Sequence, residues 1–485
     1  MNTRTIAGLA DLVEAGGTEV RIVGDRGVVV GPDVVHDSRA TTSGALFVAL
    51  PGEKVDGHDY VADAAGRGAA AALVGREVAG VSLPQLVVGD PLAGLTSLAR
   101  SLVAEARANG LVAFGITGSS GKTSTKDLLA QVLDEQGPTV SPVGSFNNEL
   151  GTPLTACKVD ATTKYLLSEM GARAKGDVAH LCSIVRPDVG IVVNIGTAHL
   201  GQFGSREAIA EAKGEMVEAL GPDGWAVLNA DDPLVDAMSS RTTARIARFT
   251  TTDGSHPRAD LVVRASGLVP DDLDRFGFEL SATTSDGRTE SARVRLQVIG
   301  EHQVANAAAA AAAAVAAGVP LTRVAQGLSG AGRRSPMRME LHELADGRAV
   351  INDAYNANPD SMAAALRALA VIGRRRRGRA GAHPGRTIAV LGDMLELGPS
   401  APQLHRSMGS LAAELGIDRV IAIGDFAADI AAGAVAGGTR ADVCSADNAI
   451  STLELLPGDV VLVKASRGLR LDAVADRLIA GEESR

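Results

Sequence analysis

The chain has 485 residues, which corresponds to about three domains at ~100–200 residues per domain. With 46% hydrophobic and 21% charged residues, the composition is that of a folded globular protein and excludes a disordered or collagenous chain. The formal net charge of −10 argues against a general nucleic-acid-binding protein. The three cysteines are far apart and form no CxxC pair, which excludes a disulfide scaffold and a structural zinc site and suits a reducing cytosol.

The N-terminal segment MNTRTIAGLADLVEAGG carries acidic side chains and lacks a basic stretch followed by an apolar run, so we expect no signal peptide. The most apolar long segment, residues 304–319, contains eight consecutive alanines. It is shorter than the ~20 residues of a membrane-spanning helix, and we expect a tightly packed buried helix. These features together predict a cytoplasmic protein without a membrane span, and we expect a monomer.

The chain divides into three α/β units, with predicted boundaries at residues 1–110, 111–330 and 331–485. The first unit mixes short β-branched runs with glycine-rich turns. The second and third contain continuous apolar runs, which are typical of parallel strands that are buried on both faces. We therefore predict an α/β protein: a small mixed domain, a central domain with a mainly parallel sheet, and a doubly wound, Rossmann-like last domain. The expected strands lie at residues 20–23, 27–30, 45–50, 111–117, 189–195, 225–228, 349–352, 387–391, 419–423 and 460–463, and a linker is expected at 327–336.

A run of basic residues, RRRRGR, occupies positions 374–379. It fits either an anion or nucleic-acid contact or a solvated loop between a helix and a strand. Because the acidic remainder of the chain supplies no supporting basic face, we favour the solvated loop.

The strongest local motif is FGITGSSGKTST, residues 114–125. An apolar strand ends here, Gly118 and Gly121 permit a tight turn, and a helix begins at about Lys122, so backbone N–H groups point at one anion. Lys122 is placed to reach the β- and γ-phosphates of a nucleotide, and the Thr123 hydroxyl to bind Mg²⁺. Ile116 stands where the common phosphate-loop pattern has a further glycine, but the strand–loop–helix context favours nucleotide binding over a plain turn.

Polar residues follow other apolar runs of the central unit. Glu169 and His199 each stand at an expected strand end, where open α/β sheets place ligand-binding groups, and with Thr123 they are candidates for a Mg²⁺ shell. Either residue taken alone is more often structural. Lys213 lies in a helical pattern where a surface lysine is the ordinary interpretation. Only eight of the 47 basic residues are lysines, however, and arginine cannot act as a neutral amine.

Ten motifs in this order resemble the Mur ligases, ATP-dependent enzymes that form the amide bonds of the peptidoglycan peptide. The resemblance covers nearly the whole chain. The motifs are GITGSSGKTS, SFNNELGTPLT, SEMGA, NIGTAHLGQFGS, AKGE, LNADDP, GEHQVANAAAA, SPMRME, DAYNANPDSM and LGDMLELG.

The last two motifs and the segment at residues 37–61 are most similar to the family member that adds D-alanyl-D-alanine to UDP-N-acetylmuramoyl-tripeptide. The resemblance implies ATP and Mg²⁺ as cofactors, an acyl-phosphate intermediate, and a UDP-muramoyl-pentapeptide as product. Family members that add diaminopimelate or lysine are the nearest alternative, although the DNPR motif usual for diaminopimelate is absent from the sequence. A ligase similar to folylpolyglutamate synthetase, a phosphate-loop switch or motor protein, and a dinucleotide-binding regulator are further alternatives.

The resemblance also implies roles for the three units and for individual residues. Residues 1–110 would bind the UDP-muramyl peptide, 111–330 would bind ATP, and 331–485 would bind the incoming dipeptide. Lys122, Lys213 and His199 are implied as catalytic, and Lys213 as a carbamate. The implied ATP-binding residues are Thr117, Gly118, Ser119, Ser120, Gly121, Lys122, Thr123, Ser124, Asn306, Arg338 and Asp353; the UDP-substrate residues are Ser38, Asn147 and Asn148; the metal ligands are Thr123, Glu169, His199 and carbamylated Lys213. Two positions depart from the family: Gln303 stands where Asn is common, and KASR at residues 464–467 replaces KGSR.

Overall fold

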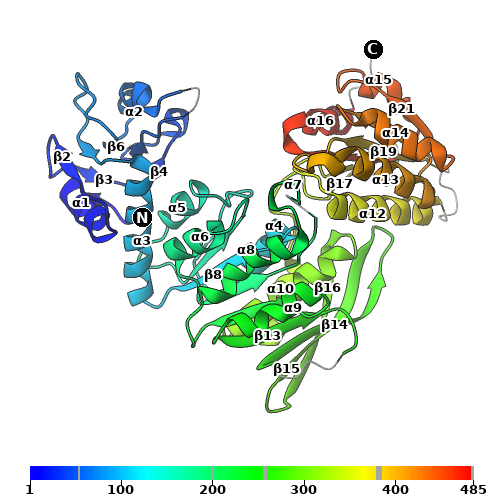
Figure 1. Cartoon of the computed structure of the whole chain (residues 1–485), viewed down its shortest axis with the longest axis horizontal. Coiled ribbons are helices and arrows are strands. Elements are labelled where there is room, and N and C mark those ends of the chain that lie inside the picture. The colour runs from blue at the N-terminus through cyan, green and yellow to red at the C-terminus, as the bar shows by residue number, and fades with distance from the viewer. Residues whose placement is uncertain (53–54, 198–199, 255–258, 378–384, 482–485) are drawn as a thin grey trace.

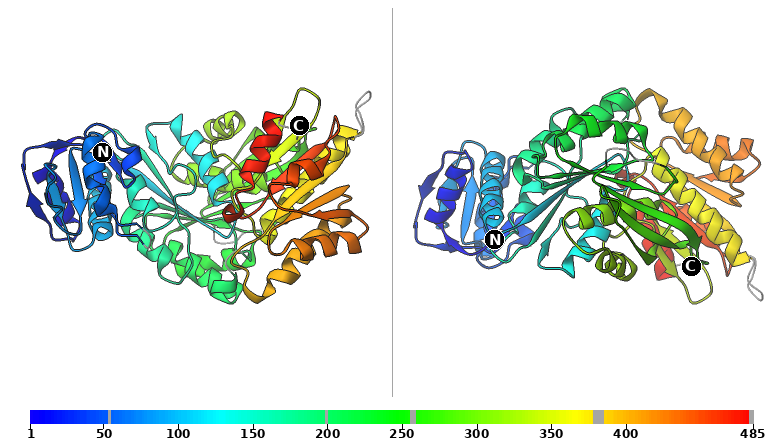
Figure 2. Two further views of the ribbon diagram at one scale, coloured as in Figure 1. Left: turned by 90° about the horizontal axis from the view of Figure 1, so that it is seen from above. Right: turned by 90° about the horizontal axis from the view of Figure 1, so that it is seen from below.

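Three β-sheets of five, nine and six strands follow one another along the chain (Figure 1). The computed structural model describes residues 1–52, 55–197, 200–254, 259–377 and 385–481. The sheets and their helices form three bodies in a row, with the nine-stranded sheet in the middle body (Figure 2). The observed class is therefore α/β with mainly parallel sheets, as predicted.

The five-stranded sheet has the strand order β2-β7-β6-β5-β4, in which only β2 runs antiparallel to its neighbour. A separate short pair joins β1 to β3. The helix α3 connects this body to the next one and packs against α1, α5 and α6, so the two bodies share one hydrophobic cluster. The elements are β1 Arg4–Thr5, α1 Ile6–Ala15, β2 Arg21–Val23, β3 Val29–Val30, β4 Val34–Val35, β5 Leu46–Val48, α2 Val61–Gly66, β6 Ala71–Val74, β7 Gln85–Val87 and α3 Pro91–Ala108.

The nine-stranded sheet has the order β16-β15-β14-β13-β12-β11-β8-β10-β9. The strands from β14 to β9 are parallel, and the strands β14, β15 and β16 form an antiparallel meander at one edge. Its strands are β8 Val112–Thr117, β9 Thr139–Val140, β10 Tyr165–Glu169, β11 Val189–Val192, β12 Trp225–Asn229, β13 Arg245–Thr250, β14 Leu261–Pro270, β15 Arg275–Thr284 and β16 Thr289–Ile299. Its helices are α4 Lys122–Asp134, α5 Gly151–Ala156, α6 Asp177–Val185, α7 Leu200–Phe203, α8 Arg206–Glu218, α9 Pro233–Asp236, α10 His302–Ala316 and α11 Leu321–Gly330.

The strands of the meander are not among the strands expected from the sequence. Their burial alternates along β14 and β15, with one face covered and the other facing water, so they lack the continuous apolar runs that marked the parallel strands. The expected linker also begins later than predicted, because α11 continues to Gly330.

The alanine-rich helix α10 is buried, as expected from its sequence. Every side chain from Ala307 to Ala314 is fully buried, and α10 contacts α4, β13 and β14. Small side chains on all sides let the helix approach both α4 and the sheet closely. This helix therefore packs beside the phosphate-loop helix α4 in the same hydrophobic cluster.

The six-stranded sheet has the order β17-β18-β22-β19-β20-β21, and only β17 is antiparallel to its neighbour. Helices cover both faces, which is the predicted doubly wound arrangement. The elements are β17 Glu340–Glu343, β18 Ala349–Asn352, α12 Pro359–Arg377, β19 Thr387–Gly392, α13 Ala401–Glu414, β20 Arg419–Ile423, α14 Ala427–Ala436, β21 Arg440–Val443, α15 Ala449–Leu453, β22 Val460–Lys464 and α16 Asp472–Ala480.

The basic run at residues 374–379 was predicted to be a solvated loop, and this prediction is wrong for its first four residues. They form the last turn of α12, where basic side chains favour the negative end of the helix dipole. Arg375 donates to the backbone carbonyl of Asp271, and Arg376 and Arg377 pair with Glu343 and Asp418. These arginines therefore bind other parts of the same chain; the rest of the run lies outside the described residues.

None of the helices in the described part of the chain combines the length and the hydropathy that a membrane span requires.

The packing of α10 yields a stability prediction. Ala310→Leu adds a larger side chain at a fully buried position and should lower the free energy of unfolding by about 1–3 kcal/mol through overpacking. Urea unfolding followed by circular dichroism measures the change. Ala316→Leu, at the partly exposed end of the same helix, is the control, and equal stability of the two variants would contradict the tight packing.

Candidate active site

The phosphate loop connects β8 to α4 and depends on two glycines. Gly118 and Gly121 have φ angles of +153° and +78°, and Gly121 directly precedes α4. A Cβ atom at Gly121 would lie 2.4 Å from Asn306 Oδ1, and one at Gly118 would lie 3.0 Å from Val193 Cβ. Both the backbone conformation and the close neighbours therefore require glycine, and the free N–H groups at the start of α4 can face an anion.

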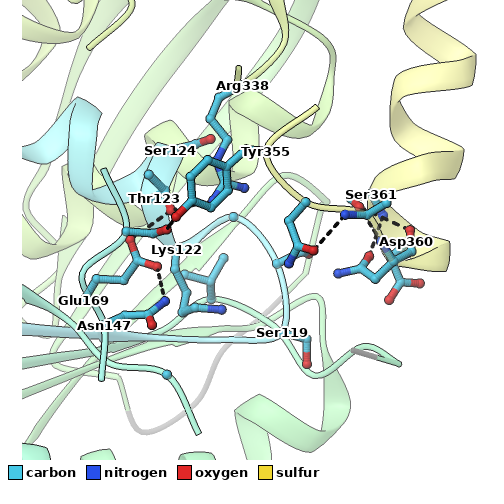
Figure 3. A pocket seen from close by; sticks show the side chains of 18 of the residues that line it. Ser119, Lys122, Thr123, Ser124, Asn147, Glu169, Arg338, Tyr355, Asp360 and Ser361 are labelled. Carbon is cyan, nitrogen blue, oxygen red and sulfur yellow. Dashed lines mark hydrogen bonds between the residues drawn. The ribbon is translucent and has the colours of Figure 1, made fainter. Parts of the chain in front are cut away.

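Thr123 is the point at which three segments meet. Its hydroxyl donates to Glu169 Oε2 at 2.9 Å and accepts from Arg338 Nη2 at 3.2 Å. Glu169 ends β10, which pairs with β8, so the sheet register brings its carboxylate beside the phosphate loop. Arg338 comes from the segment before β17, and its guanidinium lies over the Tyr355 ring at 4.2 Å (Figure 3). A cation from the last body thus reaches the phosphate loop of the middle body.

The loop before α5 completes the surroundings of Glu169. Asn147 Nδ2 donates to Glu169 Oε1 at 2.9 Å, and the Asn147 carbonyl accepts from Gly171 N at 2.8 Å. Ser145 in the same loop makes a short hydrogen bond to the Tyr355 hydroxyl. Each carboxylate oxygen of Glu169 therefore accepts a hydrogen bond. These bonds compensate the burial of the side chain, which is 1% exposed.

Two lysines in this region form no ion pair with a carboxylate of the described residues. Lys122 Nζ donates to the Gly118 carbonyl at 2.7 Å, and burial lowers the pKa of Lys122 while Glu169 opposes the shift. Lys213, on α8, is 1% exposed and has no hydrogen-bond or ion-pair partner among the described residues. Burial first, and the charge of Lys122 second, lower the pKa of Lys213 well below its usual range. The site thus favours a neutral, nucleophilic amine at this position.

Two asparagine side chains bind the phosphate loop and the helix α4 that follows it. Asn194, after β11, accepts from Ser119 N at 3.1 Å and from Ser120 N at 2.9 Å. Asn306, on α10, accepts from Thr125 Oγ1 at 3.4 Å and is itself oriented by Gln303, which accepts from Asn306 Nδ2 at 2.9 Å. The glutamine that departs from the family pattern therefore supports the neighbouring asparagine.

Asp353 belongs to an ion pair inside the last body. Its Oδ2 lies 2.5 Å from Lys464 Nζ, and its Oδ1 accepts from Met339 N at 3.0 Å. Lys464 also donates to the Asn356 carbonyl at 2.9 Å. Because Met339 follows Arg338 directly, this pair fixes the segment that carries the arginine.

These groups line a cavity of about 700 Å³ between the middle and last bodies. Its walls come from the phosphate loop, the ends of β10 and β11, the start of α10, and loops of the last sheet. Ligands of open α/β sheets bind at the carboxyl ends of their strands, and this cavity lies there. The candidate residues that line it are Ser119, Ser120, Gly121, Lys122, Thr123, Ser124, Asn147, Asn148, Glu169, Asn306, Arg338 and Asp353.

Other residues predicted from the sequence lie elsewhere. Thr117 is fully buried, and its hydroxyl donates to the Met170 carbonyl at 2.9 Å. Ser38 is in the first body, 6% exposed, and is not among the described residues lining the cavity. His199 lies outside the described residues.

Sequence reasoning did not assign roles to Asn194, Tyr355, Asp360 or Lys464. Asp360, on α12, accepts from Thr197 N at 3.0 Å across the two bodies. All four residues lie within the quoted motifs or KASR, so the motifs themselves carried a signal. Their partners come from distant parts of the chain and had no local signature.

The oxygen donors near Thr123 suit a magnesium ion. The described residues include no group of three His, Cys, Asp or Glu side chains that forms a metal centre. A hydroxyl and an oriented carboxylate are present, however, and a carbamate on Lys213 and phosphate oxygens would add further hard oxygen ligands. The donor chemistry therefore fits Mg²⁺ bound together with a nucleotide.

The position of Lys122 yields a functional prediction. Lys122→Ala should reduce ATP-dependent phosphate release at least about a hundredfold, because the developing phosphate charge loses its fixed cation. The far-ultraviolet circular dichroism spectrum should stay unchanged. Lys175→Ala removes an exposed lysine that pairs with Glu211 and serves as the control. A folded Lys122→Ala variant with more than a few per cent of wild-type turnover would contradict the assigned role.

Family comparisons agree with this architecture. Profiles described as the Mur ligase family catalytic domain, the Mur ligase middle domain and the Mur ligase glutamate ligase domain match residues 33–91, 116–314 and 337–467. The UDP-N-acetylmuramoyl-tripeptide--D-alanyl-D-alanine ligase of Mycobacterium leprae is 42% identical, over 97% of this chain and 99% of the relative. The enzyme of the same name from Escherichia coli is 33% identical over 92% and 93% of the two chains.

Solved structures resemble the whole chain as well. The MurF structure from Acinetobacter baumannii superposes with a TM-score of 0.83 at 30% identity, covering 99% of both chains. The MurF ligase of Thermotoga maritima in complex with ADP has a TM-score of 0.73 at 27% identity, covering 92% of this chain and 97% of that one. With three family profiles along its length and relatives above 30% identity over nearly all of it, the chain belongs to the Mur ligase family.

Proposed function

We propose that this protein is an ATP-dependent ligase that joins D-alanyl-D-alanine to UDP-N-acetylmuramoyl-tripeptide, giving the UDP-muramoyl-pentapeptide, ADP and phosphate. The observation that carries the proposal is the cavity in which the phosphate loop meets Arg338 and the loops of the last sheet. The names of the relatives from Mycobacterium leprae and Escherichia coli supply the two substrates, and the ADP in the Thermotoga maritima complex supports the nucleotide.

The proposed roles of the three units follow the order of the sheets. Residues 1–110, with Ser38, bind the UDP end of the acceptor, residues 111–330 bind ATP, and residues 331–485 bind the incoming dipeptide. Asn147 and Asn148 lie at the cavity and contact the acceptor from the middle unit. We further propose that the protein acts as a monomer.

The reaction must bring two anions together before an amide forms. A carboxylate oxygen of the tripeptide attacks the γ-phosphorus, the bond to ADP breaks, and an acyl phosphate results. The dipeptide amine then attacks the acyl carbon, loses a proton, and phosphate leaves from the tetrahedral intermediate. Lys122 and Arg338 offset the negative charge of the first step, and closure of the last body over the cavity keeps water from the acyl phosphate.

The proposed metal ligands are Thr123, Glu169, His199 and Lys213. Bound Mg²⁺ would neutralise phosphate charge and orient the phosphate oxygens. Asn147 holds one Glu169 oxygen and Thr123 the other, so the carboxylate is preorganised. The buried amine of Lys213, without a counter-ion among the described residues, is suited to react with carbon dioxide: a nitrogen–carbon bond forms, a proton leaves, and the side chain becomes an anionic oxygen ligand.

Substrate specificity tests the proposed function. Phosphate release is measured with ATP and each UDP-muramoyl peptide, crossed with D-alanyl-D-alanine, L-lysine and diaminopimelate. We expect turnover only with a tripeptide acceptor and D-alanyl-D-alanine, and a product whose mass exceeds that of the acceptor by one dipeptide residue. Turnover with diaminopimelate or L-lysine, or with a folate acceptor, would assign the chain to another ligase.

The carbamate on Lys213 has its own test. Lys213→Ala should lose activity by at least about a hundredfold, and acetate or formate should restore part of it by supplying a carboxylate at the vacated position. Lys213→Arg should stay inactive, because a guanidinium does not form the carbamate. Mass spectrometry of wild-type protein trapped at high carbon dioxide should show a mass increase on the peptide that contains Lys213. An active Lys213→Arg enzyme would overturn the assignment.

A further inference from the structure

A fully buried lysine that does not line the cavity binds the loop that does. Lys126 follows Lys122 by one helical turn on α4 and is 1% exposed. Its ammonium donates to the Pro142 carbonyl at 3.0 Å and to the Gly144 carbonyl at 2.8 Å, and lies 2.8 Å from Asp127 Oδ1. Two donors of the ammonium group therefore bind backbone carbonyls of one loop, and the Asp127 carboxylate lies beside it as an ion-pair partner.

The loop bound by Lys126, residues 141–150, has little apolar packing of its own. The side chains of Val143 and Phe146 are 69% and 50% exposed, although they are the large hydrophobic residues near its tip. Gly144 has a φ angle of +62°, a conformation that glycine adopts without strain. Polar contacts must therefore hold the loop in one conformation. The two hydrogen bonds from Lys126 hold the part of the loop that precedes Ser145.

The same loop carries side chains into the cavity. Asn147 donates to the Glu169 carboxylate, and Asn148 accepts from Gly151 N at the start of α5. The absence of a side chain at Gly151 lets the Phe146 backbone approach, since a Cβ there would lie 2.8 Å from Phe146 Cα. The loop is thus held at both ends, by Lys126 on one side of Ser145 and by α5 on the other.

We propose that Lys126 is a positioning residue: by binding the Pro142 and Gly144 carbonyls it sets the loop 141–150 so that Asn147 reaches Glu169 and Asn148 faces the acceptor. The anchoring follows from these contacts alone, whereas its effect on the acceptor rests on the proposed function. An ammonium suits this task because it donates to both carbonyls at once, and the Asp127 carboxylate 2.8 Å away balances its charge. A residue of the phosphate-loop helix thereby positions the loop on the acceptor side of the cavity.

The test is Lys126→Met in the full-length protein, with Lys164→Met as the matched control. Lys164 also donates to one backbone carbonyl, that of Gln136 at 3.2 Å, but on the surface and away from the cavity. The amides of Gly151, Thr152 and Gly171 donate to Asn148 and Asn147 of the loop. Their hydrogen exchange should accelerate at least about tenfold in Lys126→Met, the factor that corresponds to the loss of one hydrogen bond. The control should leave these amides unchanged.

Kinetics then separate positioning from general destabilisation. In Lys126→Met the KM for the UDP-muramoyl-tripeptide should rise about tenfold while the KM for ATP changes less than about threefold, because the phosphate loop precedes Lys126 and keeps its own contacts. Should the methionine variant not fold, Lys126→Arg retains a cationic donor and should give the same pattern at smaller amplitude.

Unchanged exchange of the three amides that donate to the loop, or equal rises of both KM values, would overturn the proposal. A wild-type protein that does not ligate D-alanyl-D-alanine would instead overturn the proposed function, and the exchange experiment would still decide whether Lys126 anchors the loop.

Discussion

The buried charges at the carboxyl ends of β8 and β10 are the feature on which the rest of the structure depends. A charge without water is costly unless a partner compensates it, so each buried ionic group here restricts its surroundings. Glu169 is compensated by Thr123 and Asn147, and Thr123 in turn accepts from Arg338. Through these contacts the middle sheet, the loop before α5 and the last body are held in one arrangement around the cavity.

The lysines near the candidate site also show that a buried charge needs a partner. Four of the eight lysines lie at or next to the candidate site, and their partners differ. Lys464 has a carboxylate, Lys126 has two carbonyls and a carboxylate, and Lys122 has one carbonyl. Lys213 has no partner among the described residues. A lysine whose charge is balanced by a nearby carboxylate is suited to a structural role. Lys122 has only one carbonyl as a described partner, so it keeps donors with which to bind phosphate. A missing counter-ion favours the neutral amine that carbamate formation requires.

Close packing around glycine and alanine makes this concentration of charge possible. Gly121 lets Asn306 approach the phosphate loop, and the alanines of α10 let the helix that carries Asn306 approach α4. Larger side chains at these positions would separate the elements and expose the charges to water, which weakens every electrostatic contact in the cavity. The low side-chain volume of α10 is thus linked to the electrostatics of the site.

Local sequence patterns were enough to predict the α/β class, several of the parallel strands and the phosphate loop. These features are encoded locally: apolar runs such as residues 112–117, glycines at positions 118 and 121, and the helix that starts at Lys122. The sequence also identified the family, because its motifs occur in order along nearly the whole chain. The meander of β14, β15 and β16 was not recognised, since strands with one solvated face lack a continuous apolar run.

The contacts among the candidate residues, in contrast, depend on the folded arrangement of distant segments. Thr123 and Arg338 are 215 positions apart, and Asp353 and Lys464 are 111 apart, so their contacts leave no local pattern. The contacts of the arginines at the end of α12 likewise depend on the Asp271 carbonyl and on the carboxylates of Glu343 and Asp418, which the fold brings to that helix end. The anchoring of residues 141–150 by Lys126 uses backbone carbonyls as acceptors. Every residue type has such a carbonyl, so the sequence could not indicate which of them the ammonium would bind.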